Sequence, residues 1–510
     1  MSHSPDHSMN ANLYALFASR FPPDRSACAI ETSDGLYYTW LDIERATARI
    51  ANLFASLNLP KDAHIAVQVE KSPEALLLYL ATIRAGYVYL PLNTAYRAAE
   101  INYFINNAKP AVVICSPVNF GWVAKIAFKS GTSHVFTLGE QRNGSLLERA
   151  THHVDTFDTA VKAPADLATI LYTSGTTGRS KGAMLTHDNL ASNAKVLQKA
   201  WQWQAGDVLL HALPLFHVHG LYVAAHGALL NGSKMIFLSK FDTAEVIRQL
   251  PRATLLMGVP TFYVRLLADP AFDKAACAAI RLFISGSAPL LTDTFDAFIT
   301  RTGHTILERY GMSETTMLTS NPVDGARIGG TVGMPLPGVA VRVVAEDGRA
   351  CAAGNIGAIQ VKGPNVFAGY WQMPEKTAEE FTDDGYFVTG DVGRFDASGY
   401  LTIVGRSKDL IISGGYNVYP KEIEMIIDDI DGVAESAVIG VPHAEFGEAV
   451  TAVVIVRAGS VLTEASIIST LKSRIANFKV PKRVHFLDEL PRNAMSKVQK
   501  NLLREQFKEG

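Results

Sequence analysis

The sequence predicts an α/β protein: a large N-terminal domain of parallel-type sheets plus a small distorted β-barrel, followed by a smaller, mobile α+β C-terminal domain. Its 510 residues exceed what one hydrophobic core supports, so at least two packed units are expected. Apolar runs that alternate with helix-like segments indicate the larger unit. A change of texture near residue 325 indicates where that unit becomes β-rich.

The first 320 residues carry the α/β signal. From about residue 40, apolar runs recur between helix-like segments: AVVIC (111–115), ATILYTSG (168–175), KMIFL (234–238), ATLLMGV (253–259), RLFISGS (281–287) and TILERYG (305–311). Runs that are apolar throughout favour parallel strands buried on both faces. Loops rich in Gly, Ser and Thr follow several of them. Because ligands gather at the carboxyl ends of such strands, these loops are expected to meet in one crevice.

The rest of the chain divides into three segments. Residues 325–405 carry short strands and turns, typical of hairpins or a small distorted barrel, with DASG at 396–399 as a hairpin turn. A charged, glycine-containing stretch predicts a hinge over 406–409. The helix-like KEIEMIIDDI and later strand-like runs predict a compact domain over 410–510, which leaves 1–405 as the N-terminal domain.

Composition excludes several classes of protein. The net charge is −2, so no global field favours nucleic acid or an anionic membrane. The four cysteines are widely spaced and form no CxxC pair, which argues against a zinc site or a disulfide framework. No apolar run reaches the length of a membrane helix, and the start lacks a signal or transit pattern. A cytoplasmic protein, monomer or homodimer, is expected.

The strongest chemical signal is the segment YTSGTTGRSKG at 172–182, directly after the apolar run ATIL. Its glycines let backbone N–H groups approach anionic oxygens, its hydroxyls add donors, and Lys181 adds a positive charge. It is not a Walker A loop, because that motif needs adjacent Gly and Lys. A flexible linker would not follow a buried strand or end in Arg-Ser-Lys-Gly. The segment therefore predicts a phosphate site.

Five further motifs follow in order: SGSAP (285–289), YGMSE (310–314), TGD (389–391), GRSKD (405–409) and PRNAMSK (491–497). Together with the phosphate loop they resemble the adenylate-forming superfamily, which includes acyl-CoA synthetases, firefly luciferase and peptide-synthetase adenylation domains. The resemblance extends along almost the whole chain. Ser313 stands where that family usually has Thr, and the hydroxyl is kept.

The resemblance implies a nucleotide site spread over most of the chain: Thr173, Ser174, Gly175, Thr176, Thr177, Gly178, Lys181, Ser287, Ala288, Pro289, Glu308, Arg309, Tyr310, Gly311, Met312, Ser313, Asp391, Arg406 and Lys497. It implies that Tyr310 stacks on adenine, which Ser287 to Pro289 line. Asp391 would accept from both ribose hydroxyls with Arg406 beside it, and Glu314 would hold Mg²⁺.

Activation of a carboxylate brings two anions together, so the site must supply positive charge and donors. By resemblance, Lys497 bridges the carboxylate and the α-phosphate, and Lys181 and His217 complete the catalytic set. The lysine must leave before the thiol of coenzyme A attacks the same carbonyl. The family's domain rotation implies a hinge at Lys408 and a coenzyme A path along Ser413, Gly414 and Gly415.

Two arginines bear on which acid is activated. Arg309 stands where most relatives have a small residue, and Arg265 lies on the helix expected after LLMGV, a segment that lines the acyl pocket in relatives. A buried arginine there is costly unless an anion pairs with it, so a second substrate carboxylate is expected. The alternatives are an internal ion pair for Arg309 and an outward-pointing side chain for Arg265.

These arginines, with HALPLFHVHG (211–220) and ERYGM, resemble malonyl-CoA synthetases. The resemblance implies malonate, perhaps with methylmalonate, as the acid, ATP and Mg²⁺ for adenylation, and coenzyme A as acceptor. His217 would gate the pocket or hydrogen-bond the distal carboxylate; a core-packed histidine is the alternative.

Rival functions remain open. One is an acyl-CoA synthetase for another short or medium-chain acid, and another is a luciferase-like oxygenase. A long-chain synthetase would favour an apolar pocket without Arg265. A peptide-synthetase adenylation domain would need an acidic residue near His217, and none occurs between 211 and 220. A non-catalytic nucleotide-binding regulator would have no need of Lys497.

Overall fold

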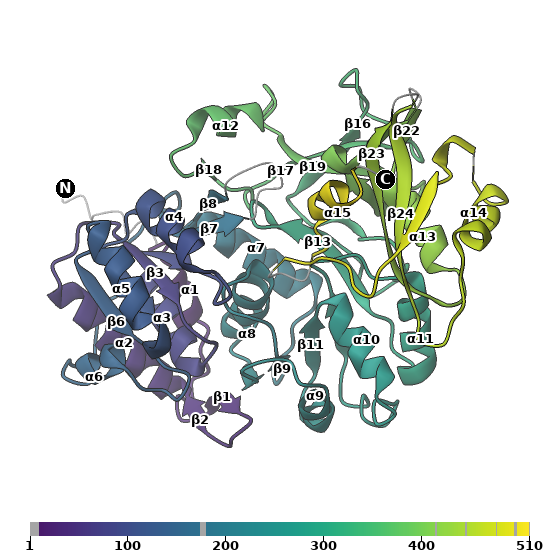
Figure 1. Ribbon diagram of the computed structural model, residues 1–510. Helices are drawn as coiled ribbons and strands as arrows, with labels where there is room; N and C mark the ends of the chain where they lie inside the picture. Colours follow the sequence, from purple (N-terminus) through teal and green to yellow (C-terminus); the bar gives the residue numbers. More distant parts are fainter. Residues whose placement is uncertain are drawn as a thin grey trace, which may run out of the picture.

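The computed structural model describes residues 10–173, 180–413, 416–443, 446–475, 477–493 and 497–508. Two mixed, mainly parallel sheets with helices form the larger part of the molecule, and a third, antiparallel sheet joins them (Figure 1). A fourth sheet with its own helices makes a separate C-terminal part. This is the mixed α/β architecture that the sequence predicts.

The first sheet has the strand order β18-β8-β7-β4-β3-β5-β6 among the described residues. Its strands are β3 (His64–Gln68), β4 (Val88–Pro91), β5 (Val112–Cys115), β6 (His134–Thr137), β7 (Leu167–Thr173), β8 (Lys181–Thr186) and β18 (Gly369–Tyr370). Strands β3 to β7 pair in parallel, whereas β8 returns antiparallel to β7 and pairs with β18. The two segments expected here as strands, 111–115 and 168–175, correspond to β5 and β7.

The second sheet has the order β15-β14-β13-β12-β11-β9-β10-β1-β2 in the described part of the chain. Its strands are β1 (Cys28–Thr32), β2 (Tyr37–Thr39), β9 (Val208–His211), β10 (Lys234–Phe237), β11 (Leu255–Gly258), β12 (Leu282–Ser285), β13 (Leu307–Met312), β14 (Thr316–Ser320) and β15 (Met334–Pro335). Strands β9 to β13 run parallel, so their carboxyl ends meet along one edge.

Helices cover both sheets. They are α1 (Leu13–Ala18), α2 (Trp40–Ser56), α3 (Pro73–Arg84), α4 (Ala98–Ala108), α5 (Phe120–Lys129), α6 (Ser145–Ala150), α7 (His187–Ala200), the π-helix η2 (His219–Ala225), α8 (His226–Asn231), α9 (Thr243–Gln249), α10 (Pro260–Ala268) and α11 (Thr292–Thr302); short 3-10 turns lie at η1 (Pro117–Asn119) and η3 (Leu250–Arg252). Every residue of α3 is buried. The largest hydrophobic core contains residues of α3, α8, β3 and β9, so it joins the two sheets.

The third sheet is antiparallel, as the closely spaced short strands predict. It consists of β16 (Ala340–Val344), β17 (Gly357–Lys362), β19 (Phe387–Phe395) and β20 (Leu401–Arg406), and α12 (Pro374–Glu379) lies between β18 and β19. The turn expected at 396–399 is present: the Gly399 N–H donates to the Asp396 carbonyl oxygen, and Gly399 adopts a φ of 86° that favours glycine.

The C-terminal part follows the 3-10 turn η4 (Ser407–Asp409). It contains β21 (Ile411–Ser413), β22 (Tyr416–Val418), α13 (Pro420–Asp428), β23 (Val433–His443), β24 (Gly447–Val456), α14 (Glu464–Lys472), η5 (Asn477–Lys479), β25 (Arg483–Phe486) and α15 (Lys500–Gln506). Its sheet has two cores of its own, one under α13 and α14 and one under α15. Figure 1 shows this part beside β13, β16 and α11.

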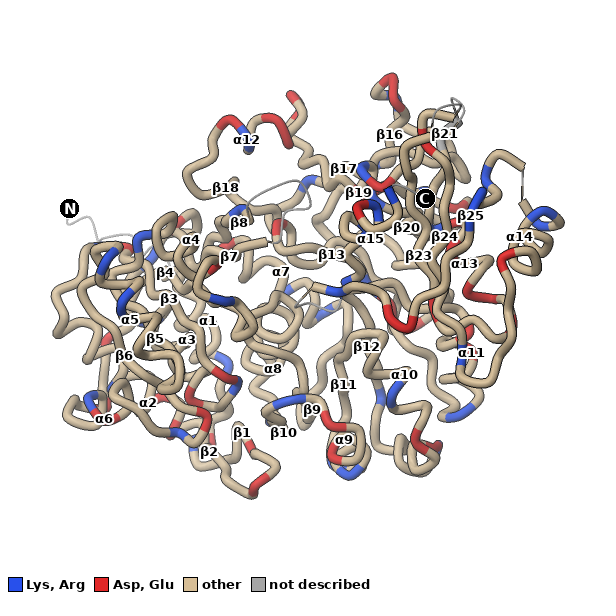
Figure 2. The backbone as a smooth tube through the Cα atoms, viewed as in Figure 1, with Lys and Arg blue, Asp and Glu red and all other residues tan. Residues whose placement is uncertain are grey.

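Charges of both signs are interspersed along the chain in Figure 2, in agreement with the near-zero net charge. The described helices include none long and apolar enough to span a membrane.

Candidate functional site

The site begins at the carboxyl ends of β12 and β13. After β12, Ser287 adopts a φ of 71°, a left-handed conformation that costs free energy for any residue other than glycine and that often marks a functional loop. Ala288 and Pro289 follow and are exposed, so they form an open wall. The Ser287 hydroxyl lies 3.3 Å from His219 Nδ1, which links this wall to η2.

A second wall is built by β19 and β20, where Asp391 stands opposite Arg406 in the antiparallel ladder. The Arg406 Nε lies 2.8 Å from Asp391 Oδ1, and the Tyr310 hydroxyl donates to Asp391 Oδ2. Asp391 is buried, and its backbone N–H donates to the Thr389 hydroxyl. An aromatic ring, a carboxylate and a guanidinium predicted from three separate motifs are thus in direct contact.

Glu314 lies in the tight turn between β13 and β14 and is buried. Desolvation raises the pKa of its carboxyl group. Its Oε1 lies 3.2 Å from the Tyr370 hydroxyl, which also lies 2.7 Å from Glu380 Oε2. Glu380 Oε1 in turn pairs with Lys181 Nζ at 2.7 Å. No pattern in the sequence pointed to Tyr370 or Glu380, because neither belongs to a motif with a recognisable chemical pattern.

Lys497 comes to this site from the C-terminal part. The residue is exposed as a whole, yet its ammonium is desolvated by the surrounding protein, and this desolvation lowers its pKa. Arg406, Asp391 and Glu314 all lie within electrostatic range of it, and so does His217. Its backbone N–H donates to Asn493 Oδ1, which fixes the local turn. The terminal lysine therefore lies close to residues of three N-terminal motifs.

Arg309 is buried on β13, and among the described residues its Nε and Nη2 have no hydrogen-bond partner. Burial lowers its pKa to about 9, so the guanidinium keeps its charge at neutral pH. Space for it depends on Gly286, where an added Cβ would lie 2.3 Å from Arg309 Cζ. The internal ion pair considered as an alternative for Arg309 does not occur in the described part of the chain.

Two histidines face Arg309. Burial, and then the nearby charges of Lys497 and Arg309, lower the pKa of His217 to about 3. Burial and Arg309 also hold the pKa of His219 well below its usual range, and His219 Nε2 has no partner among the described residues. Both imidazoles are therefore neutral at pH 7. His219 lies two residues after His217 in the HVHG segment. That spacing alone did not distinguish it from a histidine packed in the core.

Arg265 differs from its expectation. It lies on α10, the helix predicted after the strand LLMGV, but it is exposed, so the premise that it is buried is wrong. It follows Phe262 by three residues, and residues at this spacing share one face of a helix. Phe262 lines the cavity described next, but Arg265 does not, so the structure agrees with the alternative of an outward-pointing side chain.

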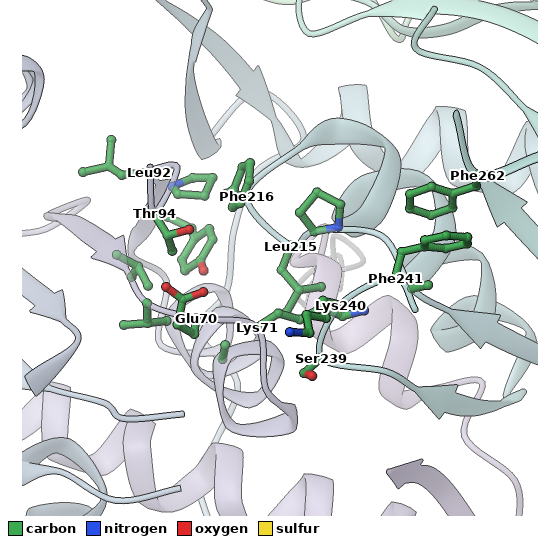
Figure 3. A pocket seen from close by; sticks show the side chains of 17 residues that line it. Glu70, Lys71, Leu92, Thr94, Leu215, Phe216, Ser239, Lys240, Phe241 and Phe262 are labelled. Carbon is green, nitrogen blue, oxygen red and sulfur yellow. The ribbon is translucent and has the colours of Figure 1, made fainter. Parts of the chain in front are cut away.

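A cavity of about 230 Å³ lies at the carboxyl ends of β3, β4, β9 and β10 (Figure 3). Apolar and aromatic side chains line most of it, with Glu70, Lys71 and Lys240 as its charged members. Lys71 is buried and donates to His211 Nδ1 at 2.9 Å and to the His211 carbonyl oxygen at 2.8 Å. The cavity also includes Phe216, the neighbour of His217 in the chain. No sequence pattern indicated this pair or this cavity.

The remaining predicted residues are placed as follows. Thr173 ends β7 and Lys181 begins β8, whereas Ser174, Gly175, Thr176, Thr177 and Gly178 lie outside the described residues. Glu308 is buried, and its Oε1 accepts from the Gly330 N–H at 3.1 Å; burial raises its pKa to about 7. Gly311, Met312 and Ser313 are half-buried at the end of β13.

The residues expected at the hinge and on the coenzyme A path lie in the next segment. Lys408 is exposed in η4 and Ser413 is buried at the end of β21, and Gly414 and Gly415 lie outside the described residues.

Two family models match this chain. The model of the AMP-binding enzyme matches residues 16–371, and that of the AMP-binding enzyme C-terminal domain matches residues 422–497. The chain therefore belongs to the AMP-binding enzyme family.

Among curated relatives, the malonate–CoA ligase of Arabidopsis thaliana is 34% identical over 98% of this chain and 89% of its own length. Among solved structures, ATP-bound MatB from Rhodopseudomonas palustris is 54% identical, covers 98% of this chain and 99% of its own, and superposes with a TM-score of 0.96. Apo MatB has the same identity and coverage but a TM-score of 0.85. The arrangement of this chain is thus more similar to the ATP-bound form than to the apo form.

Proposed function

We propose that this protein is an ATP-dependent malonyl-CoA synthetase. Malonate would react with ATP to form malonyl-adenylate and diphosphate, and coenzyme A would then displace AMP to give malonyl-CoA. The observation that carries the choice of acid is Arg309: a buried, charged guanidinium with unpartnered Nε and Nη2 among the described residues, in a pocket with two neutral imidazoles. The similarity to the Arabidopsis malonate–CoA ligase supports the same choice.

In the first half-reaction, a carboxylate oxygen attacks the α-phosphorus and diphosphate leaves. We place adenine against Tyr310 and the wall at Ser287 to Pro289, and the ribose hydroxyls at Asp391. Lys497 lies within electrostatic range of Asp391, Glu314 and His217, between the nucleotide wall and the acid pocket. From there its ammonium stabilises the charge that accumulates where the two anions meet.

Magnesium fits the residues present. Mg²⁺ is usually bound by one or two carboxylates together with substrate phosphates, and Glu314 supplies one buried carboxylate with an oxygen turned toward Tyr370. We propose Glu314 as its protein ligand and Lys181 as the cation that meets the phosphates. When bound, the ion would neutralise phosphate charge during displacement.

The distal carboxylate of malonate supplies the anion that Arg309 lacks. Without it, the buried charge is desolvated and its Nε and Nη2 have no partner among the described residues, which is costly. With it, charge-assisted bonds to Nε and Nη2 become available in the fork geometry that suits a carboxylate. We propose that Arg265 assists from the outer face of α10, and that His217 or His219 donates a further hydrogen bond. A monocarboxylate would leave the Arg309 charge unpaired.

In the second half-reaction, the thiol attacks the acyl carbonyl and AMP leaves. Lys497 must first withdraw, and we propose that the C-terminal part rotates about Lys408, which is exposed in a short turn between the last N-terminal strand and β21. Ser413 would then approach the site with the segment that follows it.

The test is AMP release that depends on an added acid, measured with ATP, Mg²⁺ and coenzyme A. Malonate, methylmalonate, acetate, butyrate and octanoate are compared at equal concentration. A strong preference for malonate is expected. A preference for a monocarboxylate would retain the adenylation chemistry and reject the pocket assignment. ATP binding with no acid-dependent AMP release would favour a nucleotide-binding regulator.

A further inference from the structure

The ammonium of Lys181 is held on two sides. Its Nζ lies 2.7 Å from Glu380 Oε1 and 4.1 Å from the centre of the Tyr370 ring. Both charged side chains are about one-fifth exposed, at 19% for Lys181 and 20% for Glu380. Lysine stems normally leave their charge free in water, so a lysine held by a carboxylate and an aromatic face has lost most of its side-chain freedom.

The fold brings these residues together from distant parts of the sequence. Lys181 begins β8, and Tyr370 lies on β18, which pairs antiparallel with β8 so that Tyr370 stands opposite Ala183. Glu380 directly follows α12, the helix that comes after β18 and lies at the upper edge of Figure 1. The Thr377 hydroxyl accepts from the Tyr370 backbone N–H at 2.9 Å, which fixes α12 to this strand.

Glu380 has more partners than Lys181 alone. Its Oε2 accepts from the Tyr370 hydroxyl at 2.7 Å, and Lys376 Nζ lies 3.4 Å from its Oε1. If the Lys181 ammonium turns toward a phosphate, the carboxylate therefore keeps a cation and a hydroxyl. A carboxylate left without partners would oppose that movement, whereas this one does not.

We propose that Glu380 is a positioning residue for Lys181, which it holds with Tyr370 so that the ammonium is preset for the phosphates of ATP. The proposal rests on the adenylation function, in which Lys181 meets those phosphates. Presetting a flexible cation strengthens binding because less side-chain entropy is lost when the ligand arrives. Glu380 acts through Lys181 and does not itself touch ATP.

The test is a double-mutant cycle on ATP affinity, measured by calorimetry without any acid substrate. Glu380→Ala should weaken ATP binding about 10-fold and raise KM for ATP to the same extent, with kcat at saturating ATP within about 2-fold of the parent. In a Lys181→Met background, Glu380→Ala should cause no further loss. Glu375→Ala is the matched control, because Glu375 is exposed on the same helix and carries the same charge; it should leave ATP affinity unchanged.

Several results would overturn the proposal. Independent losses from Glu380→Ala and Lys181→Met would show that Glu380 acts elsewhere, and tighter ATP binding in Glu380→Ala would make it a competitor of the phosphates. If the alanine variant does not fold, Glu380→Gln and Tyr370→Phe replace it, since each removes one interaction and keeps the shape. Failure of the parent protein to bind ATP would reject the proposed function itself, whereas ATP binding with an additive cycle would reject only the role of Glu380.

Discussion

The proposed nucleotide wall (Tyr310, Asp391 and Arg406) and the proposed acid pocket (Arg309, His217 and His219) differ in how their charges are satisfied. On the nucleotide wall, Asp391 pairs with Arg406 and with Tyr310. In the acid pocket, Arg309 and His219 have polar atoms without hydrogen-bond partners among the described residues. In the first region the charged groups are paired with one another. In the second region, a buried guanidinium keeps its positive charge without a hydrogen-bond partner for Nε and Nη2 among the described residues.

This difference indicates which of the two regions discriminates between acid substrates. A network whose charges are already paired adds little cost to the folded protein. An unpaired buried cation lowers the stability of the ligand-free protein, and that cost is recovered only by a ligand that carries a matching anion. The two regions should therefore respond to substitution in opposite ways.

The largest effect is expected where the two regions meet. Lys497→Ala should lower malonate-dependent pyrophosphate exchange about 1000-fold, because it removes the charge that serves both anions. ATP affinity, measured by calorimetry, should change little, since the nucleotide wall stays intact. Lys508→Ala, an exposed lysine near the end of the chain, serves as control. Exchange at the parent rate would exclude Lys497 from adenylation.

The contrast is sharpest at Arg309. Arg309→Met should lower kcat/KM for malonate about 100-fold, because the distal carboxylate loses its partner. The same change should raise the free energy of unfolding without substrate by about 1 kcal/mol, because it removes an unpaired buried charge. Steady-state kinetics with malonate measures the first effect, and chemical denaturation without malonate measures the second. A variant that is less stable and equally specific would show that Arg309 only supports the core.

The nucleotide wall should show the reverse pattern. Asp391→Asn keeps the shape but removes the charge that pairs with Arg406, so stability should fall, and KM for ATP should rise about 10-fold. The relative preference among acids should not change. An altered ratio of malonate to butyrate activity in this variant would contradict the separation of the two regions.

A smaller change is expected at Arg265. Because this residue is exposed, its interaction with the substrate is screened, and Arg265→Ala should raise KM for malonate about 3-fold with an unchanged unfolding free energy. Higher salt should weaken the parent and leave the variant less affected. An effect as large as that of Arg309→Met would show that Arg265 becomes enclosed when the acid binds.

The last prediction concerns the pH dependence of stability. His217 has a folded-state pKa of about 3, below its unfolded value of about 6.5, so the unfolded chain binds the proton first as the pH falls. Its contribution to stability is present above pH 6.5 and is lost progressively toward pH 3. In His217→Asn, the unfolding free energy between pH 6.5 and 5 should decline less steeply, by up to about 1.4 kcal/mol per pH unit. His152→Asn, an exposed histidine, should leave the slope unchanged.

Much of this arrangement could be predicted from the sequence. Uninterrupted apolar runs identified β5, β7 and β10 to β13, because parallel strands buried on both faces leave a plain signal. The motifs that hold Tyr310, Asp391 and Lys497 indicated the nucleotide wall for a similar reason, since each residue sits in a short pattern of its own.

The rest depended on contacts between distant segments. Nothing local marks Glu380 as the partner of Lys181, because they are 199 residues apart and meet only through the pairing of β18 with β8. The exposure of Arg265 was missed because a helix of mixed pattern does not say which way an arginine points. Among the described residues Arg309 has no internal ion pair. This too depends on the elements packed around β13, which the local sequence does not reveal.

Gly286 affects the proposed acid pocket only because it has no side chain and so leaves space there. A Cβ there would lie 2.3 Å from Arg309 Cζ, so the guanidinium that we propose selects the acid keeps its position only because residue 286 has no side chain. Selectivity in such a pocket can therefore change without loss of the arginine, if a single methyl group at this position turns the guanidinium away. An evolutionary shift from a dicarboxylate to a monocarboxylate could begin at a glycine.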